Sequence, residues 1–531
     1  MSSYRNNSLH LRRSPSLSRR DLLKYTGSVL ATAAFLPWAA FASESVSPVM
    51  VTLSTYMSEA RTRALPDEVV EKLKHHILDT IAAMVSGSGL PPGIAAIRFA
   101  RANAGDFARG NAAGAKGGTA HGPNPGPDRG FNRGTAGATD NLATIVCANF
   151  LAGPIDAALA NGVLAHADET DDSHPASLSH PGCAVVPAAL AAGEHFGIAG
   201  SQFLRAVALG YDIGPRVTMT LGGQNYMNDT HRDTHSIAEG FGAAASAGCA
   251  ANLNAQQMRW LLDYAAQQSS GIASWQRDTD HIEKAFVFGG MTARSGVTGA
   301  LLVQAGWTGV DDVLSGPDNF LLASAPKANP AGLIDQLGER YEVTQTAIKK
   351  WSVGSPIQAP LDALENLRKR HPFDAGQVQQ VTVRLATDEA SVVDNRDIPD
   401  ICLQHMLAVM LIDKTASFHA AHDKPRMKDP EVLRQRAKIQ LVPDAELEKL
   451  LPKRETIVEL TLSDGAHLSE RVEAVRGTPD NPMTREEVVA KSRDLLTPIL
   501  GASTCASLIE KIFALENVKD IRDLRPLLQR A

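Results

Sequence analysis

Residues 157–182 read AALANGVLAHADETDDSHPASLSHPG, and this stretch decides which fold and chemistry we expect of the chain. An apolar, alanine-rich helical pattern runs into a polar cluster, from His166 to His180, that holds three histidines and four acidic residues. Burying such a cluster is unfavourable unless its charges are paired or used in chemistry, so the cluster predicts an active site. Two alternatives stay open: a solvated helix end that Asp172 and Ser173 cap, and a metal site. The spacing, however, matches neither His-Glu-x-x-His nor a facial triad.

The pattern on both sides of this stretch is helical. Pro66 precedes an apolar repeat at helical spacing, formed by Val69, Leu73, Ile77, Ile81 and Val85. Residues 141–300 are mainly helical too, in alanine-rich blocks whose small side chains let helices approach closely. Residues 102–140 are rich in Gly, Asn and Pro, which predicts a long irregular loop between the two helical segments.

The pattern changes near residue 345. Residues 378–385 largely alternate apolar and polar side chains as a strand does, and residues 439–442 and 457–465 also look extended. Because 531 residues exceed what one hydrophobic core usually serves, we expect more than one domain. We predict a mainly α fold, in which a large all-helical domain carries an inserted, smaller α+β domain. The expected ranges are 48–344 for the first part of the helical domain, 345–478 for a lid-like α+β domain, and 479–531 for C-terminal helices that return to the helical domain.

The first 42 residues are typical of an export signal. The stretch Ser18-Arg19-Arg20-Asp21-Leu22-Leu23-Lys24 resembles the twin-arginine signal, and a mostly apolar run follows it up to a small-residue cleavage site at Ala42. We therefore expect the twin-arginine export machinery to carry the protein to the periplasm and residues 1–42 to be removed. An uncleaved membrane anchor and an ordinary Sec signal are the alternatives.

Charge and cysteine usage exclude several classes of function. Residues 1–42 hold six basic side chains and one acid, so their removal shifts the formal net charge from −6 to about −11. An acidic body disfavours nucleic acid as a partner, and anionic substrates must be drawn by a local basic site. The five cysteines are widely spaced without a Cys-x-x-Cys pair, which argues against a disulfide framework and against a zinc or iron–sulfur site. Buried free thiols are the expected state.

The stretch from 157 to 181 closely resembles the hallmark of the MmgE/PrpD family. Further similarity is spread over nearly everything from residue 50 onward, including residues 65–70, 241–245, 289–296, 305–309 and 477–484. That family includes 2-methylcitrate dehydratase, cis-aconitate decarboxylase and iminodisuccinate epimerase. The resemblance implies a homodimer and chemistry on a small polycarboxylate.

The resemblance also assigns positions within the polar cluster. The family motif falls on His166, Glu169, Asp171, Asp172, Ser173 and His180. Glu169 stands where the family usually has Asp, so the carboxylate is kept and its reach changes by one methylene. Ser173 takes a position that is often Thr, and the loop before His180 is slightly longer than usual.

Three further positions lie outside the cluster. Lys284 matches a lysine before a glycine-rich helix start, and Lys349 matches the lysine that opens the inserted domain, with its neighbour Lys350 as the competing choice. The family commonly has one more histidine about eight residues before the Phe241-Gly-Ala-Ala turn, and Asp233 stands there instead. Either of two flanking histidines is then expected to bind substrate in its place, His231 or His235.

Together these positions predict a proton-transfer site without a metal or other cofactor. The predicted catalytic residues are His180, Glu169, Asp172, Lys284 and Lys349. The predicted substrate-binding residues are His166, Asp171, Ser173, His235 and His231. Histidine supplies a base near neutral pH for removing a proton α to a carboxylate, and lysine stabilises the negative charge that develops. The acids would orient these groups or protonate a departing hydroxyl.

The leading function predicted from sequence is a 2-methylcitrate dehydratase-like lyase that removes water from a small polycarboxylic acid. An epimerase or isomerase and a decarboxylase on a di- or tricarboxylate are alternatives, because all three use related steps. An exported carboxylate-binding protein without turnover is an alternative from another class, since a fold does not fix function.

Overall fold

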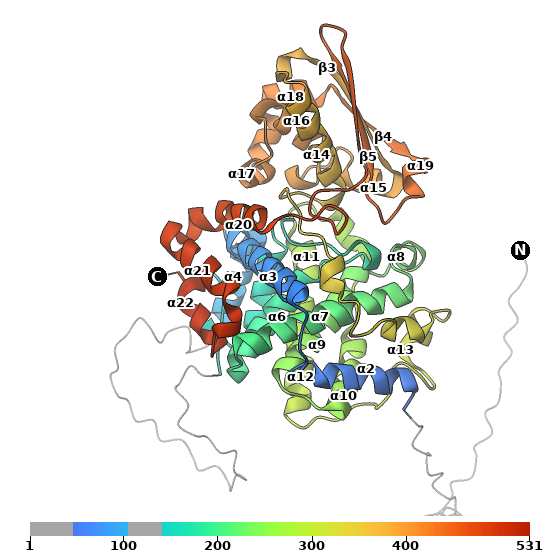
Figure 1. The fold of residues 1–531 in the computed structure, drawn as a ribbon, viewed down its shortest axis with the longest axis vertical. Helices are drawn as coiled ribbons and strands as arrows, with labels where there is room; N and C mark the ends of the chain where they lie inside the picture. Colours follow the sequence, from blue (N-terminus) through green and yellow to red (C-terminus); the bar gives the residue numbers. More distant parts are fainter. Residues whose placement is uncertain (1–45, 105–140, 531) are drawn as a thin grey trace, which may run out of the picture. The chain divides into compact units, whose positions relative to one another are not determined.

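The computed structural model describes residues 46–104 and 141–530. The leader predicted at 1–42 lies outside these residues, as does almost all of the loop predicted at 102–140. The described residues are mainly helical, with one two-stranded and one four-stranded sheet, so the predicted mainly α fold is confirmed (Figure 1).

Helices before residue 345 pack around one hydrophobic core. They are α2 (Pro48–Glu59), α3 (Asp67–Gly87), α4 (Pro91–Asn103), α5 (Pro154–Ala165), α6 (Gly182–Phe196), α7 (Gly200–Leu221), α8 (Gln224–Thr230), α9 (Thr234–Ala250), α10 (Ala255–Gln268), α11 (Ile282–Ala285), α12 (Met291–Gln304) and α13 (Phe320–Ser324). Two short strands, β1 (Ala143–Thr144) and β2 (Leu151–Ala152), pair beside them. The same core takes in the last helices, α20 (Arg485–Leu500), α21 (Ala502–Phe513) and α22 (Arg525–Leu528), and α20 packs on α3.

Residues 351–475 build a second hydrophobic core. Its helices are α14 (Ser355–Arg370), α15 (Thr387–Val393), α16 (Leu403–Asp413), α17 (Phe418–His422), α18 (Pro430–Arg436) and α19 (Ala445–Glu448). Its strands are β3 (Val378–Ala386), β4 (Ile439–Asp444), β5 (Thr456–Leu462) and β6 (His467–Val472). They lie in the order β4-β3-β5-β6, with β3 parallel to β4 and antiparallel to β5. The three segments that look extended in the sequence are β3, β4 and β5.

Two glycines let α5 come very close to the turn before α12. A Cβ on Gly162 would lie 2.2 Å from the carbonyl oxygen of Gly289, and a Cβ on Gly289 would lie 2.0 Å from the carbonyl oxygen of Gly162. Gly289 belongs to a π-helical turn, η4 (Phe286–Gly290), a kind of turn that is frequent at functional sites. Because α5 ends just before the polar cluster and η4 follows α11 directly, this backbone contact brings the cluster beside α11.

Within the described residues, the continuous helical stretch Ile282–Gln304 is long and apolar enough to cross a membrane by length and composition. However, 67% of its apolar window is buried inside the protein, where α12 packs against α9 and α5. Such burial is typical of a core helix.

Candidate active site

A cavity of about 230 Å³ lies beside the polar cluster. Part of its wall comes from the first core: Glu169, Ser173 and His180 of the cluster, His235 of α9, Lys284 of α11 and Phe288 of η4. Other parts come from α8, from the segment around Trp275, from the N-terminal turn of α14, from α15 and from the loop before β5. The cavity therefore brings together five of the ten predicted site residues, from segments far apart in the sequence.

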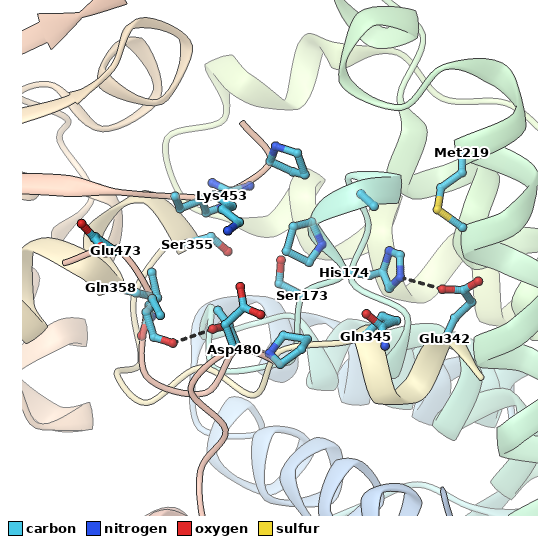
Figure 2. A pocket seen from close by; sticks show the side chains of 18 of the residues that line it. Ser173, His174, Met219, Glu342, Gln345, Ser355, Gln358, Lys453, Glu473 and Asp480 are labelled. Atoms are coloured by element: carbon cyan, nitrogen blue, oxygen red, sulfur yellow. Dashed lines mark hydrogen bonds and ion pairs between the residues drawn. The ribbon is translucent and has the colours of Figure 1, made fainter. Parts of the chain in front are cut away.

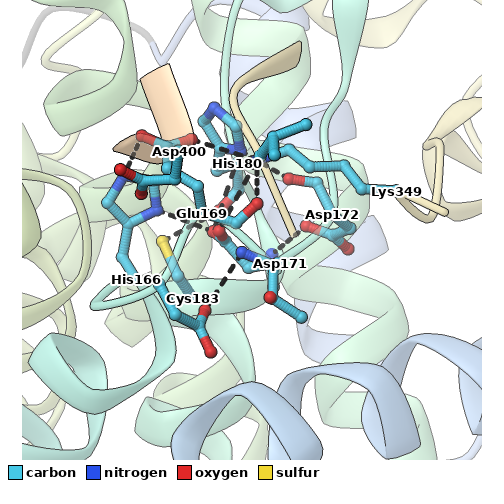
Figure 3. A network of polar contacts seen from close by, with 12 residues as sticks. His166, Glu169, Asp171, Asp172, His180, Cys183, Lys349 and Asp400 are labelled. Carbon is cyan, nitrogen blue, oxygen red and sulfur yellow. Dashed lines mark hydrogen bonds and ion pairs between the residues drawn. The ribbon is translucent and has the colours of Figure 1, made fainter. Parts of the chain in front are cut away.

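Asp172 belongs to a network of buried polar side chains (Figure 3) and accepts hydrogen bonds from several segments. Its Oδ1 accepts a hydrogen bond from the backbone N–H of Gly182 at 2.9 Å, and its Oδ2 accepts one from the hydroxyl of Tyr211 at 2.5 Å. Nδ1 of His76, on α3, lies 2.7 Å from the same Oδ2. Burial opposes ionisation, but these donors hold the pKa of Asp172 below its usual value. Since Asp172 is fully buried and does not line the cavity, it positions the loop rather than contacting a ligand.

One ring nitrogen of His180 is held by a hydrogen bond within the protein, and the other is available to a ligand. Its Nδ1 lies 2.5 Å from the backbone carbonyl oxygen of Asp172, and a carbonyl only accepts, so Nδ1 carries the proton and donates it. No described residue pairs with Nε2, and the side chain lines the cavity. Burial, and then the ammonium of Lys349, hold the pKa of His180 well below the usual histidine value. The ring is therefore neutral, with an unprotonated Nε2.

His235 repeats this arrangement with a carboxylate in place of the carbonyl. Its Nδ1 lies 2.9 Å from Oδ1 of Asp233, which also accepts a hydrogen bond from Nε1 of Trp275 at 3.0 Å. Burial opposes ionisation of Asp233, but the imidazole of His235 and these donors lower its pKa, so Asp233 is a carboxylate. The His235 ring stacks on Phe288 at a centroid distance of 4.0 Å. The position where the family commonly has a histidine thus holds the residue that orients His235.

Glu169 lies between two ammonium groups. Nζ of Lys284 pairs with its Oε1, while Nζ of Lys349 lies 3.2 Å from its Oε2 and donates to its backbone carbonyl at 2.9 Å. Burial opposes ionisation, but the two cations hold the pKa of Glu169 well below its usual value. Lys350, the competing choice from sequence, pairs instead with Glu365 at 2.6 Å. Lys349 is therefore the lysine that joins the cluster.

Two groups of described side chains have the spacing of a metal site, and the donors of both are already engaged. In the group of His166, Asp171 and Cys183, the first two pair with each other at 2.8 Å, and the Cys183 thiol donates to the backbone carbonyl of His180 at 3.1 Å. The other group consists of His166, Glu169 and His281, single atoms of which lie within 4.8 Å of one another. Two lysines pair with the Glu169 carboxylate, however, and Nε2 of His281 donates to the backbone carbonyl of His166 at 3.0 Å. A divalent cation would have to displace these contacts, so the donor set does not fit a metal.

The other predicted residues lie around the cavity rather than on it. His166, Asp171, Asp172 and Lys349 are buried and contact residues of the wall without lining it. His166 and Asp171 pair with each other, Nδ1 to Oδ2, at 2.8 Å. His231 is exposed and does not line the cavity, whereas its alternative, His235, does.

The structure also adds residues that the sequence pattern does not single out. They are His76 and Tyr211 at Asp172, His281 beside His166, and the pair Arg454 and Glu389 on the cavity wall. Only His76 gives a local signal, because it stands with His75 directly before the apolar part of α3. Arg454 and Glu389 lie more than 200 positions beyond the cluster and belong to no motif.

Comparison with known proteins identifies the family to which this site belongs. A family model of the MmgE/PrpD N-terminal domain matches residues 132–332, and one of the MmgE/PrpD C-terminal domain matches residues 351–516. A cis-aconitate decarboxylase of Aspergillus terreus is 26% identical over 413 residues, covering 71% of this chain and 81% of that protein. A cis-aconitate decarboxylase-like protein, oryM, of Aspergillus oryzae is 23% identical over 541 aligned positions, covering 90% of this chain and 97% of that protein. The cis-aconitate decarboxylase of Homo sapiens is 25% identical over 407 residues, covering 71% and 79%.

Proposed function

The chain belongs to the MmgE/PrpD family, and from that premise we propose that it is a metal-independent lyase that acts on a small polycarboxylate. The observation that carries the proposal is that His180 and Lys284 line one cavity, the first with an available Nε2 and the second with its ammonium group. Chemistry at a carbon next to a carboxylate needs such a proton-transfer group together with a cation. The relatives named as cis-aconitate decarboxylases support the same substrate class.

Within this class we favour decarboxylation over the dehydration expected from sequence. Dehydration needs an acid that protonates the departing hydroxyl, and Glu169 and Asp172 are the predicted candidates. Glu169 is ionised between two lysines, and Asp172 accepts hydrogen bonds from donors outside the cavity. Neither carboxyl is in the state that this step needs. Decarboxylation has no departing hydroxyl, and the names of the relatives also favour it.

The proposed reaction breaks the bond between a substrate carbon and one carboxylate. Carbon dioxide leaves, and the electron pair stays on the substrate, delocalised onto a neighbouring unsaturated acid. Lys284 stabilises this charge, and a proton from Nε2 of His180 or His235 completes the new C–H bond. A bound polyanion favours the protonated imidazole, because a nearby opposite charge stabilises the charged form.

Dehydration is the second candidate function, because two imidazoles, those of His180 and His235, line the cavity. The rings of His180 and His235 are stacked with their centroids 5.3 Å apart, and each has its Nδ1 proton fixed by an acceptor. One ring could remove the α proton while the other protonates the hydroxyl. In that case neither Glu169 nor Asp172 is needed as an acid.

Product analysis in D₂O tests the proposal. We expect the purified protein, with EDTA present, to release carbon dioxide from cis-aconitate and to place one deuterium in the product seen by NMR. Citrate and 2-methylcitrate serve as hydroxy-acid substrates. An alkene formed from either without carbon dioxide would establish dehydration, and deuterium exchange without net conversion would indicate an epimerase. Ligand-induced shifts without any product would indicate a binding protein.

His180→Gln tests the role of the histidine in whichever reaction is found. Loss of a general acid–base group is expected to lower turnover by about 100-fold or more. Unchanged turnover in this variant contradicts the assignment.

We also propose, on the sequence alone, that the protein reaches the periplasm by the twin-arginine route and acts there as a homodimer. A mass of about twice that of the chain in light scattering tests the second point.

A further inference from the structure

The active-site cavity has a second cation, which comes from the segment that builds the second core. Among the described residues that line it, the lysines and arginines are Lys284 and Arg454. Arg454 lies in the loop between α19 and β5, and its Nη1 donates to Oε1 of Glu389 on α15 at 2.6 Å. Lys284 is already paired with Glu169, so a substrate with several carboxylates needs a further positive group.

Polar atoms beside Arg454 are left without partners. Oε2 of Glu389 is buried and has no hydrogen-bond partner among the described residues, although the side chain is only 5% exposed. Oγ of Ser355 is likewise buried and unpaired, at the first residue of α14. Both residues line the cavity. Buried polar atoms are nearly always paired, and the Ser355 hydroxyl can donate to an anion, so its free state indicates that a ligand completes the site. The free oxygen of Glu389 only accepts, so it adds nothing to anion binding and its carboxylate serves to hold Arg454.

The N-terminal turn of α14 faces the same place. Gly354, Ser355 and Pro356 line the cavity, and no side chain caps this 16-residue helix. The N-terminus of a helix favours a negative charge through its backbone N–H groups and its dipole. The helix end, the guanidinium and the free hydroxyl therefore all favour an anion.

A second cavity, of about 380 Å³, adjoins this place (Figure 2). Ser173, Ser355 and Arg454 line both cavities, so they form the partition between them. A carboxylate held at Arg454 would lie at this partition, whereas neither Lys284 nor Lys349 lines the second cavity. The carboxylate that anchors the substrate would therefore bind at Arg454, while the reacting carbon lies beside Lys284 and His180.

We propose that Arg454, Ser355 and the N-terminal turn of α14 bind the substrate carboxylate farthest from the reacting carbon, with Glu389 holding the guanidinium in place. The proposal rests on the proposed function for its substrate class. It makes Arg454 a specificity-determining residue that favours tricarboxylates over dicarboxylates. Guanidinium is suited to this because its fixed fork matches a carboxylate in two parallel hydrogen bonds.

Binding of two inert ligands tests the subsite without requiring turnover. Tricarballylate has three carboxylates, and methylsuccinate is the same skeleton without one terminal carboxylate. We expect Arg454→Gln to weaken tricarballylate binding by about 10- to 100-fold in calorimetry or NMR titration, because a charge-assisted hydrogen bond is lost. Methylsuccinate binding should change by less than about threefold. Arg454→Lys keeps the charge and should restore part of the affinity.

Arg471→Gln is the matched control. It removes one positive charge from the same part of the chain, where Arg471 pairs with Glu455 away from the cavity. Equal weakening of both ligands by Arg454→Gln, or the same effect from Arg471→Gln, overturns the proposal. If the protein binds tricarballylate through Arg454 but converts no substrate, the proposed function fails and the subsite stands. If cis-aconitate is converted with an Arg454→Gln KM equal to that of the wild type, the subsite fails and the function stands.

Discussion

Lys284 and Lys349 both pair with Glu169, but only Lys284 lines the cavity. Its ammonium group is therefore the one that can lie beside negative charge on a substrate. We expect Lys284→Met to lower kcat by about 100- to 1,000-fold, the loss typical of a removed charge-stabilising donor. Lys350→Met is the control, because Lys350 pairs with Glu365 outside the cavity. A kcat for Lys284→Met near that of the control contradicts the assignment.

Asp171 makes the stability of the protein depend on pH. Burial raises its pKa to about 7, although the ammonium of Lys349 opposes the shift. An unfolded Asp titrates near pH 3.9, so between about pH 4 and about pH 7 the folded state holds the proton more tightly. This group therefore contributes stability at the low end of that window, and the contribution is lost as the pH rises to 7.

Asp171→Asn removes this dependence. From about pH 5.5 to about pH 7.5, the unfolding free energy of the wild type should fall, relative to the variant, by on the order of 2 kcal/mol. Urea denaturation of both proteins at both pH values measures the change. A difference that stays constant, or that moves in favour of the wild type as the pH rises, disproves the raised pKa.

At the scale of elements, the contact between α5 and η4 sets the geometry of the site. Gly162→Ala would place a Cβ 2.2 Å from the carbonyl oxygen of Gly289 and push the two backbones apart. We expect a loss of about 1–3 kcal/mol in unfolding free energy, and lower activity because the cluster moves away from Lys284. Gly153→Ala, at the N-cap of the same helix, is the control, since a Cβ there meets nothing within 4 Å. Equal melting temperatures for the two variants would show that the close approach of α5 and η4 does not limit stability.

Local sequence pattern predicts elements and the polar cluster well, because both depend on neighbouring residues. The alternation at 378–385 is β3, and the cluster does line a cavity. Asp233 also carries a local signal, since Asp before a helical run is a typical N-cap, and its carboxylate accepts from the backbone N–H of Ser236 at 2.7 Å. Comparison with the family pattern shows only that Asp233 replaces a histidine, and does not indicate that it caps α9.

Contacts between distant elements could not be predicted in this way. His76 reaches Asp172 across 96 positions, and no periodicity in either segment specifies that pairing. Arg454 reaches the cavity only because the second core packs beside the first, and its own loop has no motif. The choice of Lys349 over Lys350 likewise depends on which side chain turns toward Glu169.

At the scale of the whole molecule, the polar cluster is held by segments from both cores. Nζ of Lys491, on α20, donates to the backbone carbonyl of Thr170 at 2.9 Å, and Nε2 of His422, on α17, donates to that of Asp168 at 3.0 Å. These contacts are formed only once the end of the chain has folded onto its beginning. The site is therefore complete only once both cores have formed and packed together.

The state of the cysteines matters if the protein is exported as we propose. All five are buried and free, as expected from sequence, so folding before export shields these thiols from an oxidising compartment.

We expect replacement of Arg19 and Arg20 by lysine to leave the uncleaved chain of 56.5 kDa in the cytoplasm, whereas the wild type appears in the periplasm without residues 1–42. Cell fractionation with mass spectrometry measures both. Replacement of Arg12 and Arg13 by lysine is the control, because it keeps the motif. Unimpaired export of the Arg19 and Arg20 variant would point to a Sec signal, and a periplasmic protein that keeps its N-terminus would point to an anchor.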